Sequence, residues 1–415
     1  MKDHIFDMTH DCDALIVGGG LTGPLISIAL ASEGLSSIVV DAGKVSQQRS
    51  ENFDGRAYAL TLTSIRMLEV LGIWNDLKAH AEPILDIKVS DGLAGMGASP
   101  LFLHFNHREI EEGPFGHLVE DRFLRRALLD RISDNPRIRH LSGTKVLSAS
   151  NGAITTDARK KADRDLKGRL VVGCDGRASR VARWSGIERT GWDYGQTSLV
   201  CALEHERPHQ GIAHQFFTPA GPLAILPLKG NRSSIVWTEK RELAEDIQAR
   251  SDEGYLQALR PVFGDFLGDI KLVGERFSYP LGLSLANSFV ENRVALAGDA
   301  AHGIHPLAGQ GFNLGVRDGA ALCEVLVEAS RRGEDIGSLD VLERYQRWRR
   351  FDTASLAVAT DGINRLFSND NPLLRLARDI GLGAVNRVPD FRRGFMREAA
   401  GLSGDMPRLL TGQRI

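Results

Sequence analysis

The sequence contains few cysteines and no cysteine cluster. Its 415 residues include only Cys12, Cys174, Cys201 and Cys323, and no two of them form a C-x-x-C pair. Disulfide frameworks and zinc sites need cysteines at shorter, repeated spacings. Neither is predicted, and no metal ligands are proposed.

The first residues, MKDHIFDMTHDCD, are charged where a secretory signal would be apolar, so we expect a protein of the reducing cytoplasm.

The sequence also lacks an excess of charge of one sign. It has 51 basic and 53 acidic side chains and no long basic run, so no nucleic-acid partner is expected.

One stretch, from Ala14 to Ser32, carries no charge and approaches the length of a membrane span. Glycine and proline inside it disfavour one continuous helix. The interrupting residues are Gly18, Gly19, Gly20, Gly23 and Pro24.

This stretch instead predicts the start of a βαβ unit. The expected order is a strand, a glycine turn, a helix and a second strand, at 14–17, 18–21, 22–32 and 37–40. Gly18, Gly20 and Gly23 fit G-x-G-x-x-G, in which glycines allow a tight turn and close approach of the backbone to a pyrophosphate. Asp41 follows the second strand, where a carboxylate accepts hydrogen bonds from a ribose. The unit predicts dinucleotide binding, with NAD and FAD both open.

Two later segments repeat a strand followed by an acid. The segment GRLVVGCDGRASRVARWSGI contains a strand from Leu170 to Val172 that ends at Asp175, and alone it predicts only a strand and a turn. The segment NRVALAGDAAHGIHPLAGQGFNLGVRDGAAL has a strand from Val294 to Ala297, then Asp299, then a long helix from about Gly311. Each glycine costs conformational entropy on ordering, so a cluster of them predicts close approaches of the backbone to a ligand.

These three segments, in this order, resemble the FAD fingerprints of the flavin-dependent aromatic hydroxylases of the para-hydroxybenzoate hydroxylase type. HPLAGQGFNLGVRD, residues 305–318, is similar to the signature of the ubiquinone-biosynthesis hydroxylases of the UbiH type. The resemblance extends over nearly the whole chain. Its further segments are FDGRAYALTLTSIRMLEVLGIW at 53–74, GPLAILPLKGNRSSIVW at 221–237 and RLFSNDNPLLRLARDIGL at 365–382.

The resemblance implies an α/β fold with three parts. These are a Rossmann-like FAD-binding domain, an inserted and mainly antiparallel β-sheet substrate domain, and a C-terminal helical part. The implied boundaries are 10–81, 108–187 and 276–340 for the discontinuous FAD-binding domain, 82–107 and 188–275 for the substrate domain, and 341–415 for the helical part.

The resemblance also implies the site residues. Arg56, in the family segment whose arginine lies near the flavin, and Pro306 are the expected catalytic residues. Asp299 is expected to bind the ribityl chain, and a helix beginning near Gly311 would direct its N–H groups and its partial positive charge at the isoalloxazine. The full set expected to bind FAD is Gly18, Gly20, Gly23, Asp41, Arg56, Arg122, Asp175, Asp299, Pro306, Gly309, Gly311 and Asn313.

Two features of the sequence bear on this site: an arginine that departs from the family motif, and a pair of histidines. The family's Asp-Gly motif continues Ser-x-x-Arg, whereas here the arginine after Ser179 is displaced by one position, to Arg183. Since that motif contacts both FAD and nicotinamide in the family, the electron donor stays open between NAD(P)H and another reductant. His302 and His305 resemble a metal pair, but Pro306 interrupts any regular helix there, and we expect both histidines to order the loop.

The implied activity is that of a monooxygenase. Reduced FAD would take up O2 at its C4a carbon, and the resulting hydroperoxide would hydroxylate the ring of a polyprenylated phenol in ubiquinone biosynthesis. A second dinucleotide motif is missing, because GLAGMG at 92–97 lacks a βαβ context.

One alternative function is a hydroxylase of a small soluble aromatic acid, which would need a cation for the carboxylate. Another is a non-catalytic FAD-binding scaffold of a biosynthetic complex.

The C-terminal region suggests where the protein works. After Asn364, nine arginines face five acidic residues, interleaved with leucine and phenylalanine. This composition is typical of contact with an anionic membrane and equally of a helical cap on the flavin domain. The expected location is the cytoplasm, with peripheral contact to the cytoplasmic face of a membrane. Candidate partners are the polyprenylated phenol, O2 and other proteins of ubiquinone biosynthesis.

Overall fold

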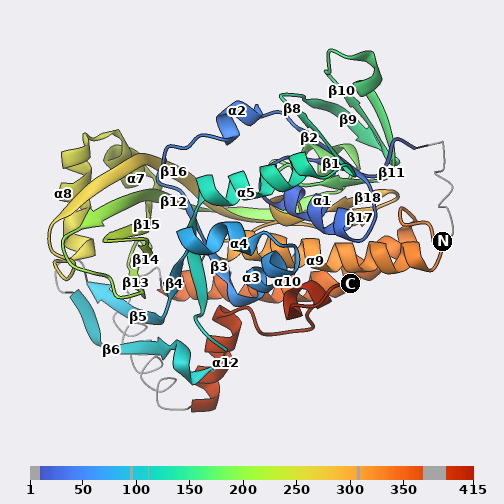
Figure 1. Cartoon of the computed structure of the whole chain (residues 1–415). Coiled ribbons are helices and arrows are strands. Elements are labelled where there is room, and N and C mark those ends of the chain that lie inside the picture. Colours follow the sequence, from blue (N-terminus) through green and yellow to red (C-terminus); the bar gives the residue numbers. More distant parts are fainter. Residues whose placement is uncertain (1–9, 94–96, 111, 306–308, 368–388) are drawn as a thin grey trace.

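We describe the protein from a computed structural model (Figure 1). It describes residues 10–93, 97–110, 112–305, 309–367 and 389–415. The helices are α1 (Thr22–Ser32), α2 (Val45–Gln48), α3 (Leu62–Val70), α4 (Trp74–Leu77), α5 (Asp121–Asp134), α6 (Arg180–Trp184), α7 (Arg241–Ala249), α8 (Asp252–Phe263), α9 (Gln310–Arg331), α10 (Leu339–Phe367) and α12 (Pro389–Ala399). Short 3-10 turns are η1 (Lys78–His80), η2 (His107–Glu109), η3 (Lys161–Asp163), η4 (Gly298–Ala300) and η6 (Arg408–Thr411).

The first sheet has the strand order of a Rossmann-like fold. Its path is β17-β18-β11-β1-β2-β8, and every neighbouring pair from β18 to β8 is parallel. Parallel strands end at the same edge, so the residues that follow β2, β1, β11 and β18 lie along one edge of the sheet. The strands are β1 (Cys12–Val17), β2 (Ser37–Asp41), β8 (Ile138–Ser142), β9 (Val146–Ser150), β10 (Ala153–Thr156), β11 (Asp165–Gly173), β17 (Val290–Glu291) and β18 (Val294–Leu296).

The helix after the first strand is buried on all sides. Residues 23–31 of α1 are all buried, between the sheet, α5 and α9. An apolar helix without a polar face needs such surroundings, which explains why this uncharged stretch does not require a membrane. The largest hydrophobic core of the described chain contains side chains of α1, α9 and the strands β1, β2, β11 and β18.

The second sheet is mainly antiparallel, and only β5 and β13 pair in parallel. Helices α7 and α8 cover its outer face, where Trp237 and Tyr255 lie in a separate core. Its strands, in spatial order, are β19 (His302–Gly303), β16 (Ile270–Ala286), β12 (Arg189–His205), β15 (Arg232–Lys240), β14 (Gly221–Leu228), β13 (Ile212–Thr218), β5 (Asp86–Leu93) and β6 (Gly97–Asn106).

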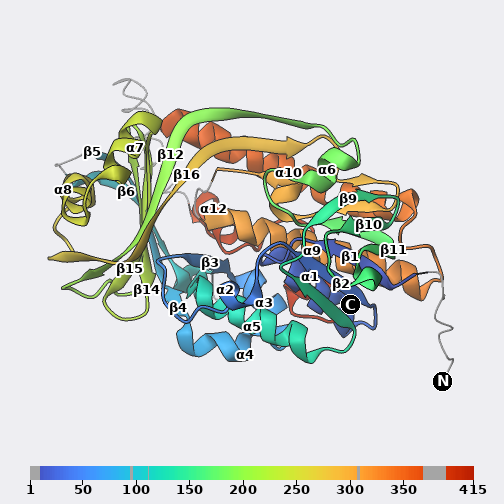
Figure 2. The ribbon, with the colours of Figure 1, turned by 90° about the horizontal axis from the view of Figure 1, so that it is seen from above.

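Two long strands connect the two parts of the molecule. β12 and β16 pair antiparallel from Arg189 with Ala286 to His205 with Ile270. Figure 2 shows them running from the second sheet to the region of α6. A third, small sheet lies between the parts and consists of β3 (Ala57–Thr61), β7 (Gly116–Glu120) and β4 (Glu82–Ile84). The α/β architecture with an inserted antiparallel sheet and a helical C-terminal part is confirmed.

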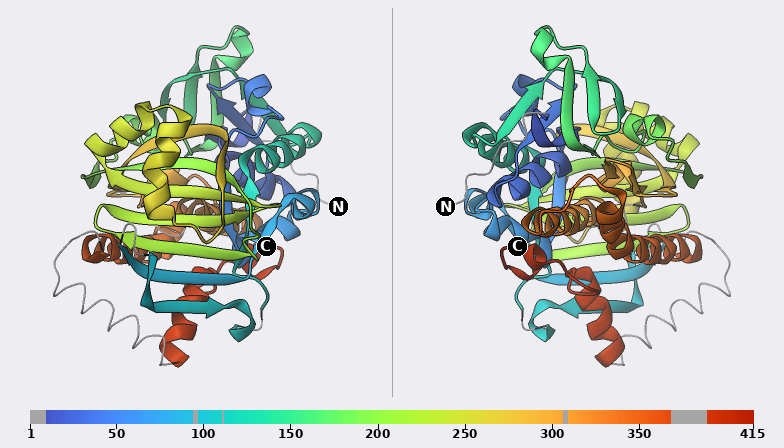
Figure 3. Two further views of the ribbon diagram at one scale, coloured as in Figure 1. Left: turned by 90° about the vertical axis from the view of Figure 1, so that its left-hand side faces the viewer. Right: turned by 90° about the vertical axis from the view of Figure 1, so that its right-hand side faces the viewer.

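The C-terminal helix α12 packs beside the second sheet. Met396 is fully buried in a core with Phe105 and Ile110, whereas Phe395 is half-exposed. Figure 3 shows α12 in red beside β5 and β6 in blue-green, at the edge of the molecule. An ion pair between Arg392 and Glu109 fixes it there. Within the described residues, no helix is long and apolar enough to cross a membrane.

Candidate active site

The glycine turn after β1 has two close contacts and one open position. A Cβ on Gly18 would lie 2.3 Å from the carbonyl oxygen of Cys174, and a Cβ on Gly23 would lie 2.0 Å from that of Gly18. A Cβ on Gly20 meets no described atom within 4 Å. Gly18 and Gly23 therefore serve the packing of the protein itself, while Gly20 borders open space.

The carboxylate of Asp41 lies beside this turn. It accepts hydrogen bonds from the N–H groups of Gly19 at 2.6 Å and Gly43 at 2.7 Å, and from the side-chain amide of Gln48 at 2.9 Å. These bonds hold the acid at the end of β2. Ionised carboxylates accept several hydrogen bonds at once, so these contacts leave capacity for a ribose hydroxyl.

Asp175 is occupied by its own loop. One carboxylate oxygen accepts from the hydroxyl of Ser179 at 2.6 Å, and the other accepts from the N–H groups of Arg180 at 2.7 Å and Val181 at 3.1 Å. Asp175 thus stabilises the start of α6 in the way that an N-terminal cap does. Because Cys174 touches Gly18, this capped loop lies directly beside the glycine turn.

The third acid, Asp299, lies close to the start of α1. Gly298, with φ +63°, would place a Cβ 3.0 Å from Oγ1 of Thr22. The side chain of Asp299 is 46% exposed, and the nearest cation of the described residues is Arg177, with Nε at 3.6 Å. The two segments predicted to bind the diphosphate and the ribityl chain therefore meet in space. The carboxylate of Asp299 has free capacity to accept hydrogen bonds.

Helix α9 begins with a glycine turn of its own. Gly309 adopts a left-handed conformation, with φ +66°, and no side chain caps the helix. A Cβ on Gly311 meets no described atom within 4 Å. Asn313 is used inside the protein, because its Oδ1 accepts from the hydroxyl of Ser64 at 2.7 Å and its Nδ2 donates to the carbonyl of Ala59 at 2.7 Å. Pro306 lies outside the described residues.

Arg56 lies between the small sheet and β16. Its guanidinium binds Asp54 at 2.6 Å and Asp121 at 3.4 Å and lies over the ring of Phe277. Burial opposes its charge, but the two carboxylates outweigh burial and raise its pKa. Arg56 is therefore a permanent cation that reaches the second sheet.

Arg122 lies at the start of α5. It binds Glu120 at 2.7 Å and the carbonyl of Glu51 at 2.6 Å, and it lies over the ring of Phe123. Within the described residues, no hydrogen bond connects Arg122 to the glycine turn or to Asp299. Each of the two arginines is thus held in place by its own ion pairs.

His302 and His305 have different surroundings. His302 is hydrogen-bonded to the buried carboxylate of Asp318, whereas neither ring nitrogen of His305 has a partner among the described residues. Burial lowers the pKa of His305 to about 4, with a smaller contribution from Arg177. His302 orders the loop, as the sequence predicts for both histidines. Within the described part of the chain, His305 is a neutral ring without a hydrogen bond, beside Tyr194.

Several residues that shape this site are not among those expected from the sequence. Asp318 lies within the signature segment, so its role was within reach of the sequence. Arg189 of β12 binds the turn at Asp299 and Arg349 of α10 binds Asp318, and neither arginine has a local sequence signal. The full set of unassigned residues is Thr22, Arg177, Arg189, Asp318 and Arg349.

The arrangement fits FAD. The starts of α1 and α9 carry neither a capping side chain nor an acid in the first turn, so their N–H groups and partial positive charge are available to an anionic ligand. Open space borders Gly20 and Gly311, and Asp41 and Asp299 supply acceptors at the sheet edge. A dinucleotide needs donors for phosphate and acceptors for sugar hydroxyls, and both are present.

Comparisons with known proteins agree with this geometry. The profile of the family described as "FAD binding domain" matches residues 11–358. "Ubiquinone hydroxylase UbiL" of Rhodospirillum rubrum is 44% identical over 403 residues, which cover 96% of this chain and 92% of the relative. The chain belongs to the FAD-dependent ubiquinone hydroxylases. FAD is the cofactor of this hydroxylase, and it is an enzyme of the monooxygenase class.

More distant comparisons agree. The "3-demethoxyubiquinol 3-hydroxylase" of Escherichia coli is 30% identical to this hydroxylase over 389 residues, 93% of this chain and 98% of the relative. Among solved structures, p-nitrophenol 4-monooxygenase PnpA from Pseudomonas putida has a TM-score of 0.77 at 18% identity, with 94% of this chain and 98% of that chain covered. That likeness establishes the shared fold.

Proposed function

We propose that this hydroxylase acts on the aromatic ring of a polyprenylated phenol on the route to ubiquinone. Two relatives are named as a ubiquinone hydroxylase and a 3-demethoxyubiquinol 3-hydroxylase, and the first is similar along nearly the whole chain. The observation that carries the proposal is the chemistry of one face of the second sheet, which is uncharged at its centre and carries apolar and hydroxyl side chains.

That face follows from the alternation of side chains along the strands. Leu199, Leu223 and Ile235 point toward α7 and α8. The alternate residues lie on the opposite face, where Ala202 and Leu226 pack with Leu118 of the small sheet. The central residues of this inner face are Ser198, Val200, Ala202, Ala224, Leu226, Ser234, Val236 and Thr238.

The inner face favours a phenol with an apolar tail over an aromatic acid. A carboxylate-bearing substrate needs a cation at hydrogen-bond distance, and none of these central residues is charged. Arg56 lies over Phe277 beside this face, but its guanidinium is already paired with Asp54 and Asp121. Arg232 continues the same face toward one end, but its guanidinium is already bound to Glu120 at 2.8 Å. The residues Val200, Leu226 and Val236 are partly exposed on this face and supply apolar surface for a ring or a tail.

The roles of the cofactor-binding residues follow from their contacts. The N–H groups at Gly20 and the start of α1 would hold the diphosphate, and Asp41 the ribose. Asp299 would accept hydrogen bonds from the ribityl hydroxyls, and the start of α9 at Gly311 would face the isoalloxazine. FAD supplies the electron storage and the oxygen activation of the reaction. The protein's part is to orient the ring and to exclude water, for which the apolar inner face is suited.

Arg56 is the proposed cation of the active site, because its side chain joins the small sheet to Phe277 of β16. No described side chain has to act as a nucleophile. Pro306 keeps its expected role beside the flavin as a proposal from the family resemblance alone. The electron donor is proposed to be NAD(P)H, and the displaced Arg183 makes the donor the first point to test.

Contact with a membrane is part of the proposal, since a polyprenylated substrate resides in lipid. Arg393, Phe395 and Arg397 are exposed on α12, and basic and aromatic side chains on one helix favour an anionic lipid surface. The substrate would enter from that side. Other proteins of ubiquinone biosynthesis remain candidate partners.

One experiment separates the hypotheses. Oxygen uptake by the FAD-loaded protein is measured with NADH or NADPH, together with either a polyprenylated phenol or 4-hydroxybenzoate. Uptake stimulated by the polyprenylated phenol supports the proposal, and stimulation by the acid alone favours the alternative hydroxylase. Absence of uptake with every reductant and phenol favours the scaffold. Mass spectrometry of the intermediate that accumulates in a deletion strain then identifies the ring position from the missing hydroxyl.

A further inference from the structure

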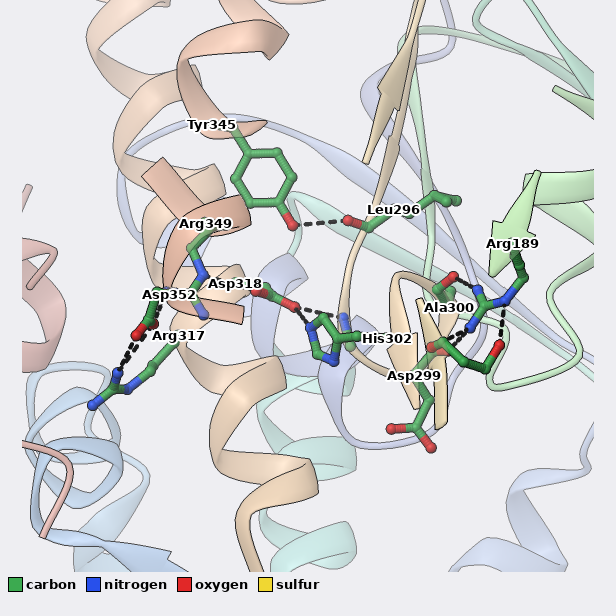
Figure 4. Close-up of polar contacts among 12 residues, drawn as sticks. Arg189, Leu296, Asp299, Ala300, His302, Arg317, Asp318, Tyr345, Arg349 and Asp352 are labelled. Carbon is green, nitrogen blue, oxygen red and sulfur yellow. Dashed lines mark hydrogen bonds and ion pairs between the residues drawn. The ribbon is translucent and has the colours of Figure 1, made fainter. Parts of the chain in front are cut away.

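The turn that presents Asp299 is tied at both ends to a single carboxylate oxygen. The N–H of Gly298 donates to Oδ2 of Asp318 at 2.9 Å, and Nε2 of His302 is hydrogen-bonded to the same oxygen. Asp318 belongs to α9, so the tie crosses from the turn to the helix (Figure 4). Asp299 lies between the two tied residues, and its own side chain is not part of the network.

The charge of Asp318 is secured from the other side. Arg349 of α10 donates through Nε to Oδ1 of Asp318 at 2.8 Å, and both side chains are almost completely buried. Burial alone would raise the pKa of Asp318, but His302 and Arg349 outweigh burial and lower this pKa to about 2. The carboxylate is therefore ionised at neutral pH and able to hold both ties.

The backbone on the opposite side of the turn is held as well. Arg189 of β12 donates to the carbonyl of Asp299 at 3.3 Å and to the carbonyl of Ala300, as Figure 4 shows. The main chain around Asp299 is thus fixed from two sides. Among the described residues, its carboxylate has only the contact with Arg177 at 3.6 Å. A fixed backbone that carries a free carboxylate is the arrangement expected for a residue that binds a ligand in one orientation.

We infer that His302 and Asp318 are positioning residues that set the direction of the Asp299 carboxylate for FAD. This inference rests on the proposed role of Asp299 in holding the ribityl chain. A purely structural role is the competing explanation, because any buried hydrogen-bond network also stabilises the fold. The two explanations differ in what the loss of the tie does to cofactor affinity when the protein remains folded.

The test compares two substitutions of His302. Glutamine places an amide nitrogen close to the position of Nε2, so His302→Gln retains a donor to Asp318. Phenylalanine fills a similar volume without any donor. The dissociation constant of FAD is measured by flavin fluorescence quenching and the Tm of the apoprotein by thermal unfolding. We expect His302→Phe to weaken FAD binding about tenfold, as for the loss of one well-placed bond, and His302→Gln to restore it. If His302→Phe does not fold, His302→Met, with a flexible side chain, replaces it.

Tyr345→Phe is the matched control. Its hydroxyl donates to the carbonyl of Leu296 at 2.8 Å, in the same buried region but before the turn begins. We expect Tyr345→Phe to lower the Tm of the apoprotein while FAD affinity stays unchanged. Equal losses of FAD affinity in Tyr345→Phe and His302→Phe would indicate general destabilisation and overturn the inference.

A double-mutant cycle with Asp299→Ala decides the question. If His302 acts through Asp299, His302→Phe changes FAD affinity less than about twofold once Asp299 is alanine. Additive effects, or an Asp299→Ala variant with unchanged affinity, overturn the inference. The measurement uses no aromatic substrate, so its result is independent of whether the proposed substrate is correct.

Discussion

Gly298 and Thr22 touch, although they are 276 positions apart along the chain: a Cβ on Gly298 would lie 3.0 Å from Oγ1 of Thr22. A Cβ on Gly315 of α9 would lie 2.8 Å from the same oxygen. The start of α1, the turn that carries Asp299 and the first turns of α9 therefore converge on one threonine. This convergence makes a single extended dinucleotide site out of three remote segments.

The glycine turn provides a prediction that separates packing from ligand binding. Gly20→Ala adds a methyl group to open space, so the apoprotein should keep its Tm, while the methyl group should weaken FAD binding about tenfold by blocking close approach of the diphosphate. Gly23→Ala should instead lower the Tm, because its Cβ would overlap the carbonyl of Gly18. Fluorescence titration with FAD and thermal unfolding measure the two effects. Unchanged affinity in Gly20→Ala would contradict the proposed diphosphate site.

Asp175 provides a second prediction. Its carboxylate accepts three hydrogen bonds at the start of α6, so Asp175→Ala should lower the free energy of unfolding by about 1 to 3 kcal/mol. FAD affinity of the folded variant should change less than in Asp299→Ala. Urea unfolding and FAD titration measure both quantities. A loss of affinity without a loss of stability would show instead that Asp175 contacts the cofactor directly.

Local sequence signals predicted the elements of the two glycine-rich segments well. The second strand is predicted at 37–40 with Asp41 after it and is found at Ser37–Asp41, and the helix predicted from about Gly311 begins at Gln310. Glycine turns and short apolar runs carry this information within a few residues. The strand around Leu170 is longer than predicted and begins at Asp165, because the antiparallel partner β10 extends it.

Contacts between remote residues were not predictable in this way. The boundary expected at residue 276 falls inside a strand, because β16 runs from Ile270 to Ala286. Its pairing with β12, which no local pattern encodes, continues across that boundary. The same holds for Arg349, which reaches Asp318 from α10. The sequence pattern indicated the acids of the site. It did not indicate the residues that hold those acids in place.

His305 makes a prediction about pH. Its pKa in the folded protein is about 4, below the ordinary value of 6.5, because burial disfavours the charged ring. The unfolded chain therefore takes up a proton between pH 6.5 and pH 4 that the folded chain does not, and stability falls as the pH decreases through this range. From pH 7.5 to pH 5 this one group should cost about 2 kcal/mol. Urea unfolding of wild type and His305→Phe at both pH values measures the difference. An equal loss of stability in both proteins would contradict it.

The inner face of the second sheet provides the last prediction, which concerns substrate affinity. Ser198 and Thr238 are opposite each other on β12 and β15, and among the described residues neither hydroxyl has a hydrogen-bond partner. A buried hydroxyl without a partner lowers stability, so Ser198→Ala and Thr238→Val should leave the Tm unchanged or raise it slightly.

If these hydroxyls bind the oxygens of a phenolic ring, the same substitutions should raise KM for the polyprenylated phenol about fivefold to tenfold with little change in kcat, because a bond present in both the ground state and the transition state affects binding alone. Ser233→Ala is the control. Its hydroxyl binds His205 at 3.0 Å on the opposite face, so its loss should lower the Tm and leave KM unchanged. Steady-state oxygen uptake gives KM and kcat for all three variants. Equal KM values in Ser198→Ala, Thr238→Val and wild type would mean that the ring is oriented by other groups, with Arg56 the next to examine.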